Sequence, residues 1–232
     1  MLEPLLALFL LLPFRIGEKA LYHVKYGPFK AGTMELSVVD TVRIRGRLAY
    51  HFLLKAETGD PFSAFFKVAD EIHSYVDVET FATLRYEKHL REGKYRADRI
   101  VDYMPDSGKA VYPDGDTVEI PRGALDPLAV FYFVRLRRIE SGETLRVPYH
   151  VDRRSMTLVI TAERYKNFKT PMGEFRALKV VPDFKGVNVF KSRRGMELWI
   201  CPELSGIPLQ IKTKLFIGSL RAEIFDYFPG SG

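Results

Sequence analysis

The feature that most constrains the fold of this chain is an alternation of apolar and polar residues with a period of two, which recurs from residue 16 almost to the end. Successive side chains of a β-strand point to opposite faces, so this alternation is typical of strands with one buried and one solvated face. The clearest example is LQIKTKL at residues 209–215. Gly, Pro, Asn and Asp separate such stretches, as expected for turns. Their spacing predicts about ten or more antiparallel strands.

Residues 84–103 predict a hairpin. Leu84, Tyr86 and Leu90 alternate with charged residues, and the turn Glu92-Gly93-Lys94 leads into a second alternating stretch. Aromatic residues make up 13 % of the 232 residues, which also favours strands, because large flat side chains pack well on a pleated surface.

One segment, residues 126–138, breaks the alternation and predicts a helix. Asp126 suits the N-cap and Pro127 the first helical position, while Arg135, Arg137 and Arg138 suit the C-terminal end of the helix dipole. Residues 128–134 are apolar on all sides, so the helix should be covered, most simply by lying across the concave side of a curved sheet. Such a helix either fills the core or also lines a ligand cavity.

The predicted fold class is therefore all-β, with one helix packed on a large, curved antiparallel sheet that forms a half-barrel or a partly open barrel. Hydrophobic residues make up 47 % and charged residues 28 % of the chain, enough for an ordinary core. The single cysteine, Cys201, excludes an intrachain disulfide and is interpreted as a buried structural thiol.

Residues 1–14 form a nearly continuous apolar stretch and are interpreted as a signal peptide or hydrophobic leader, with residues 15–232 as a single β-rich domain. A membrane-spanning helix needs about 20 apolar residues, so the stretch is too short for an anchor. No Lys or Arg precedes it and no Ala-x-Ala site follows it, which leaves a buried first strand or a hydrophobic helix as the alternative. The predicted location is outside the cytoplasm, in the periplasm or cell envelope.

Motifs for catalysis and cofactor binding are absent from the sequence. It has no Gly-x-Ser-x-Gly elbow, phosphate-binding loop or dinucleotide fingerprint. The five histidines occupy separate predicted strands without the spacing of a metal site. We therefore predict no catalytic residue, no metal and no cofactor.

The formal net charge of +6 favours anionic partners. Basic residues gather in two groups, and an anionic membrane surface is the predicted partner, with a solvated rim of loops as the alternative. The groups comprise Arg135, Arg137, Arg138, Arg146, Arg153 and Arg154, and then Lys191, Arg193 and Arg194. Nucleic acid is not expected, because the basic residues match no known nucleic-acid-binding module.

Several landmarks, taken in order, carry a resemblance to a known family. They are Gly17-Glu18-Lys19 with Tyr22, Tyr26-Gly27-Pro28-Phe29-Lys30-Ala31-Gly32, Asp126-Pro127-Leu128 with Tyr132 and Arg135, Gly142, Thr170-Pro171-Met172-Gly173-Glu174-Phe175, Leu198-Trp199-Ile200 and Pro208. Together they resemble the bacterial domain of unknown function 3108 across roughly residues 15–228. The resemblance implies an exported, β-rich envelope domain, similar in shape to the half-barrels that carry lipoproteins. It implies no reaction and no catalytic residue.

The leading functional hypothesis is a non-enzymatic envelope protein that binds a hydrophobic or lipid-like ligand between the concave sheet face and the helix. Aromatic residues would line the site and an arginine would bind an anionic head group. The candidate residues are Tyr22, Tyr26, Phe131, Tyr132, Arg135, Arg138 and Trp199. The alternatives are an interaction scaffold with a filled core and a cofactor-free enzyme.

Overall fold

The computed structural model describes residues 12–183, 195–215 and 218–231. Within these ranges the chain forms fourteen β-strands, one α-helix and two short 3-10 helices. The strands are β1 (Lys19–Tyr26), β2 (Phe29–Ile44), β3 (Arg47–Thr58), β4 (Ala69–Asp77), β5 (Thr83–Glu92), β6 (Tyr95–Met104), β7 (Lys109–Val111), β8 (Thr117–Glu119), β9 (Thr144–Val151), β10 (Arg154–Thr170), β11 (Gly173–Asp183), β12 (Met196–Cys201), β13 (Ile207–Lys214) and β14 (Ser219–Phe228). The helices are η1 (Phe62–Ala64), α2 (Pro127–Arg137) and η2 (Pro202–Leu204).

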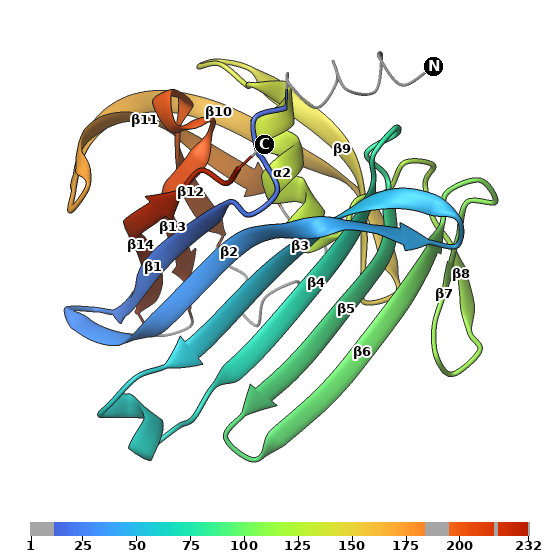
Figure 1. Ribbon diagram of the computed structural model, residues 1–232, viewed down its shortest axis with the longest axis horizontal. Coiled ribbons are helices and arrows are strands. Elements are labelled where there is room, and N and C mark those ends of the chain that lie inside the picture. The colour runs from blue at the N-terminus through green and yellow to red at the C-terminus, as the bar shows by residue number, and fades with distance from the viewer. Residues whose placement is uncertain (1–11, 184–194, 216–217, 232) are drawn as a thin grey trace.

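All fourteen strands belong to one antiparallel sheet, in the order β8-β7-β6-β5-β4-β3-β2-β1-β14-β13-β12-β11-β10-β9. The sheet consists of two meanders, β1 to β8 and β9 to β14, that α2 connects in sequence. The first and last strands pair in the middle of the sheet, with Tyr22 opposite Ile224. The sheet curves around α2, which lies within the curve between the early and the late strands (Figure 1).

The outer strands β8 and β9 are not hydrogen-bonded to each other, so the barrel is not closed by a strand ladder. A short segment before α2 bridges part of the gap. The Leu125 N–H donates to the Pro148 carbonyl of β9 at 2.8 Å, and the His150 N–H donates to the Leu125 carbonyl at 3.0 Å.

Side chains complete this junction, which we call the seam and define as the contacts of residues 99–119 with residues 148–155. Tyr103 donates to the His150 carbonyl at 2.6 Å, and the Tyr112 hydroxyl lies 2.8 Å from His150 Nε2. Arg153 forms ion pairs with Asp114 and Asp116. The seam therefore rests mostly on side-chain contacts.

The core lies between the concave face and α2, as the period-two pattern requires. Tyr50 and Phe52 of β3 are buried on this face, whereas His51 between them is only half-buried. Leu158 and Ile160 of β10 bury the same face of the second meander. Cys201 is buried and free, as the sequence predicts.

Phe14 belongs to this core although the sequence places it in the leader. Its side chain is 3 % exposed and makes edge contacts with the rings of Tyr50, Phe52 and Tyr132, with centroids 5.3–5.5 Å apart. Residues 1–11 of the predicted leader lie outside the described residues. No helix in the described ranges combines the length and apolarity needed to cross a membrane.

The predicted fold class is confirmed: the sheet is large, curved and antiparallel, it is not closed, and one helix packs on it. The predicted hairpin is β5–β6, and the predicted helix is α2 with Asp126 as its N-cap. The described residues form fourteen strands, in agreement with the expected ten or more. Strands β7 and β8 have three residues each and are too short to give an alternating pattern of their own.

Candidate functional site

The position of α2 is fixed first at its N-terminal end, by the buried carboxylate of Asp126. One oxygen accepts hydrogen bonds from the N–H groups of Leu128 at 2.8 Å and Ala129 at 3.0 Å, which is the N-cap arrangement. The other accepts from the hydroxyls of Ser74 at 2.5 Å and Thr83 at 2.8 Å. Burial raises the pKa of the Asp126 carboxyl above its usual value. These bonds fasten the start of the helix to β4 and β5.

Along its length α2 packs against β3, β4 and β9. The ring of Tyr132 stacks on Phe52 with centroids 3.7 Å apart and planes 6° from parallel, and its hydroxyl donates to the Ser37 carbonyl at 3.1 Å. Burial raises the pKa of Tyr132, so it stays a neutral phenol. The helix therefore rests firmly on the first meander.

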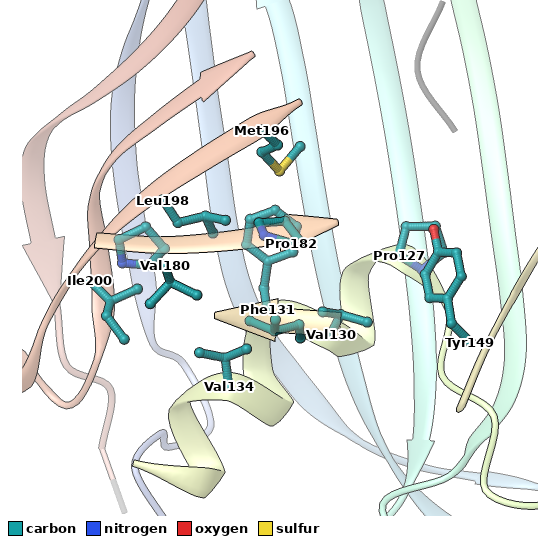
Figure 2. A pocket seen from close by; sticks show the side chains of 12 residues that line it. Pro127, Val130, Phe131, Val134, Tyr149, Val180, Pro182, Met196, Leu198 and Ile200 are labelled. Carbon is teal, nitrogen blue, oxygen red and sulfur yellow. The ribbon is translucent and has the colours of Figure 1, made fainter. Parts of the chain in front are cut away.

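A small apolar cleft lies on the other side of α2, between the helix and β10 to β13. Its volume is about 30 Å³. Figure 2 shows Val130, Phe131 and Val134 of the helix facing the side chains of β11 and β12. The lining consists of Pro127, Val130, Phe131, Val134, Tyr149, Ile160, Val180, Pro182, Met196, Leu198, Ile200 and Pro208. Tyr149 is the only ionisable residue in this lining, and burial raises its pKa. The cleft is thus suited to apolar groups.

The C-terminal end of α2 is anchored by a buried ion pair between Arg135 and Glu18. Both side chains are almost fully buried, and two parallel hydrogen bonds of 2.7 and 2.8 Å join them. Arg135 also donates to the carbonyls of Ser205 at 3.0 Å and Pro13 at 2.8 Å. Four of the five guanidinium N–H groups are therefore used within the protein. Nearby, Tyr22 is buried, and its hydroxyl has no hydrogen-bond partner among the described residues.

Three histidines of adjacent strands line up on the convex face of the first meander. His51 Nε2 lies 2.9 Å from His73 Nδ1, and the rings of His73 and His89 have centroids 5.7 Å apart. The His51 ring stacks on Tyr75, its cross-strand neighbour. Burial, followed by the proximity of His73, lowers the pKa of His51. This row could not be predicted from the sequence, because it depends on the register of three strands.

These histidines do not form a metal site. Across residues 12–183, 195–215 and 218–231, no three His, Cys, Asp or Glu side chains are arranged to hold a metal ion. His89 instead lies 2.7 Å from Asp98, and Asp98 also accepts from Arg91.

Residues 21–224 match the family described as "Protein of unknown function (DUF3108)". The chain belongs to the DUF3108 family. No curated protein matches the sequence.

The DUF3108 chain is also similar to solved structures. A β-barrel-like protein of the domain of unknown function DUF1849 from Brucella abortus has a TM-score of 0.60 at 10 % identity, with 92 % of this chain and 98 % of that chain covered. This similarity shows the fold alone. A DUF1089 family protein from Pseudomonas aeruginosa has a TM-score of 0.44 at 11 % identity, covering 77 % and 88 %. A predicted lipoprotein from Parabacteroides distasonis has a TM-score of 0.39 at 9 % identity, covering 94 % and 98 %.

In this DUF3108 chain the predicted ligand residues are not gathered at one place. Phe131 lines the cleft, whereas Tyr22 and Tyr132 lie in the core. Tyr26 is the last residue of β1, a central strand of the sheet, and Arg138 is exposed after α2. Trp199 packs with Phe168 on the face opposite to Leu198 and Ile200, with centroids 5.1 Å apart. As ligand residues these remain predictions.

The basic residues predicted to face a membrane are also dispersed in the DUF3108 chain. Arg135 is buried with Glu18, and Arg153 is paired with Asp114 and Asp116 in the seam. Arg137, Arg146 and Arg154 are exposed. Lys191, Arg193 and Arg194 lie outside the described residues.

The cleft residues of β11 to β13 were missed by the sequence reading. Val180, Pro182, Met196 and Ile200 look like ordinary alternating strand residues. The only available signal was that residues 128–134 are apolar on every side, which requires a second apolar surface against α2.

Proposed function

We propose that this protein is a non-enzymatic protein of the cell envelope that holds a hydrophobic or lipid-like ligand in the cleft between α2 and strands β10 to β13. The observation that carries the proposal is the chemistry of the cleft, whose lining is apolar apart from the hydroxyl of Tyr149. Such a surface matches a hydrocarbon chain and offers no pair of groups for acid–base catalysis.

The size of the cleft sets a condition on this function. Ligand sites usually measure about 300–1,000 Å³. A cleft of about 30 Å³ is therefore too small to hold a lipid chain as it stands. A ligand therefore enters only if side chains move aside. Phe131 is half-buried on α2, and Met196 is unbranched and flexible, so these two are the residues expected to move.

The same small volume favours a second candidate function, an interaction scaffold whose core is filled by its own side chains. Under this alternative the cleft is a packing defect and binds nothing. Ligand binding therefore distinguishes the two functions.

The envelope location rests on the apolar leader predicted for residues 1–14, which is typical of an exported protein. Export would place the cleft where lipids and lipoproteins are the abundant apolar molecules.

The test enlarges and fills the cleft in separate variants. Phe131→Ala removes a ring and opens a volume on the order of 100 Å³, comparable to engineered cavities that bind small aromatic molecules. We expect fatty-acid binding to tighten at least five-fold in Phe131→Ala and to weaken at least as much in Val180→Phe. Displacement of a fluorescent fatty acid measures the affinities, and native mass spectrometry measures the stoichiometry.

Phe133→Ala is the matched control. Phe133 lies on the same helix but faces Phe81, with ring centroids 5.9 Å apart, and does not line the cleft. Its affinity should equal that of the unmodified protein. If neither the unmodified protein nor Phe131→Ala binds a fatty acid saturably, the carrier function is wrong and the scaffold function stands.

A further inference from the structure

Exposed aromatic side chains gather at one end of the sheet. Within the described residues, seven large apolar side chains are more than a third exposed, and five of them belong to three neighbouring turns. We call these five the aromatic rim: Tyr26, Phe29, Phe65, Phe66 and Tyr95. Phe65 is 88 % exposed and Phe29 62 % exposed, although exposure of a phenylalanine to water is unfavourable. A concentration of such residues marks a contact surface.

The three turns form one continuous surface. The Gly59 N–H donates to the Ala31 carbonyl at 3.0 Å, joining the η1 turn to the β1–β2 hairpin. The Gly93 N–H donates to the Lys67 carbonyl at 2.7 Å, joining the η1 turn to the β5–β6 hairpin. Phe66 packs so closely on Gly93 that a Cβ there would lie 2.9 Å from its ring. Figure 1 shows these three turns together at the end of the sheet away from the C-terminal end of α2.

Basic residues are interleaved with the aromatic rim. Lys30, Lys67, Lys94 and Arg96 are exposed in the same turns, which contain only two acidic residues, Asp60 and Glu92. Among the described carboxylates none forms an ion pair with these four cations, whereas most other basic side chains of the first meander are paired. Asp60 is itself engaged by the Ser63 hydroxyl. The rim therefore presents unneutralised positive charge beside exposed rings.

We propose that the aromatic rim docks on an anionic lipid membrane, with Phe29 and Phe65 inserted at the level of the head groups. Aromatic rings and lysines on protruding turns match the two parts of a bilayer interface, because the rings enter the head-group region while the ammonium groups stay at its charged surface. A protein partner would instead require a flat, closely packed apolar centre with few lysines. Each basic residue near an anionic surface strengthens binding about five-fold.

This inference is independent of the cleft, since the two surfaces share no residue. Docking through the aromatic rim places the end of the sheet that carries the three turns against the membrane. The C-terminal end of α2 then points away from the membrane.

The first experiment measures flotation of the full-length protein with vesicles of phosphatidylcholine alone or with 30 mol % phosphatidylglycerol. Phe29→Ser/Phe65→Ser should weaken binding to the anionic vesicles at least ten-fold, and Lys67→Gln/Lys94→Gln should remove most of the preference for them. The matched control is Val39→Ser/Phe228→Ser, two apolar side chains that are 41 % and 48 % exposed outside the rim, and it should bind as the unmodified protein does.

The second experiment measures contact of the rim itself with lipid. This matters because residues 1–14 are apolar, are present in every variant and could bind vesicles without the rim. Trp199 is buried and serves as a constant background. Brominated lipids should quench the added tryptophan of a Tyr95→Trp variant and leave that of a Phe228→Trp variant unchanged. Equal quenching in both variants, or equal flotation of Phe29→Ser/Phe65→Ser and the unmodified protein, would overturn the proposal. Fatty-acid binding by Phe131→Ala is unaffected by either outcome.

Discussion

Arg135 joins α2 to two distant parts of the chain through one guanidinium group. The partners are Glu18 and the Pro13 carbonyl in the segment before β1, and the Ser205 carbonyl after η2. The rings of Phe14 and Tyr132 also lie beside it, with their centroids 5.7 and 5.4 Å from the guanidinium carbon. Taking both charges out of water is unfavourable, so the pair is stabilising only while both partners are present.

Arg135→Met should therefore destabilise the protein strongly, because it leaves the Glu18 carboxylate buried without a counter-charge. The expected loss is about 3–5 kcal/mol in the free energy of unfolding, measured by urea denaturation. The double variant Glu18→Gln/Arg135→Met should lose less than Arg135→Met alone. Arg137→Met, at an exposed neighbouring position, should change stability by no more than about 0.5 kcal/mol. A double variant less stable than Arg135→Met would show that the pair does not behave as a buried ion pair.

The same residue shows the limit of sequence reasoning at this scale. A cation at the end of an apolar helix was correctly placed near the C-terminus of α2, and Asp126 was correctly assigned as the N-cap. The partner of Arg135 could not be predicted, because Glu18 lies 117 positions earlier and the sheet alone brings it there. The hydrogen bonds from the hydroxyls of Ser74 and Thr83 to Asp126 could not be predicted for the same reason.

At the scale of elements, the seam depends on His150. Its side chain is fully buried, with Nε2 2.8 Å from the Tyr112 hydroxyl and Nδ1 2.9 Å from the Ser155 hydroxyl. Burial lowers the pKa of His150 from 6.5 to about 4. The neutral imidazole is thus part of the junction between the two meanders.

Acid should therefore weaken the fold through this residue. In the unfolded chain His150 takes up a proton below about pH 6.5, whereas in the folded chain it does so only near pH 4. The stabilisation is fully present above pH 6.5 and is lost as the pH falls to 4, with a decrease of up to about 3 kcal/mol. Urea denaturation at several pH values measures it.

A His150→Gln variant should show a flatter dependence of stability on pH between 6.5 and 4. Identical slopes in His150→Gln and the unmodified protein would assign the acid sensitivity to other groups.

The individual strands and the helix were predicted better than the pairing of strands with one another. The β5–β6 hairpin and α2 follow from local pattern alone, because their contacts are close in sequence. The pairing of β1 with β14 and the row His51, His73 and His89 depend on registers that no local pattern encodes. The aromatic rim could not be predicted either. Phe29, Phe65 and Tyr95 lie in separate turns of the sequence, and only the folded sheet brings these turns together.

At the scale of the whole molecule, the N-terminal segment completes the core. Phe14 fills the space between α2 and β3, and the Gly17 N–H donates to the Val38 carbonyl of β2 at 2.8 Å. The core of the described residues therefore includes Phe14, which lies one residue before the predicted start of the β-rich domain.

Phe14→Ala should destabilise the protein by about 3–5 kcal/mol, as expected for a large ring removed from a packed interior. Phe65→Ala, at an exposed ring, should cost less than about 0.5 kcal/mol. We also expect that a mature chain recovered after export retains Phe14, which intact-mass measurement determines. A stable mature chain that begins at Arg15 would contradict this role of Phe14.

The two outer edges of the sheet determine how the protein can associate with others. The edge strand β8 has only three residues, and β9 is interrupted by Pro148, which has no N–H, beside the bridge to Leu125. Longer unpaired stretches lie on other strands of the described sheet: residues 95–101 of β6 pair with β5 but not with β7, and residues 165–170 of β10 pair with β11 but not with β9. Strand addition by another polypeptide, the usual start of domain swapping and of fibrils, is therefore expected at these stretches and not at β8.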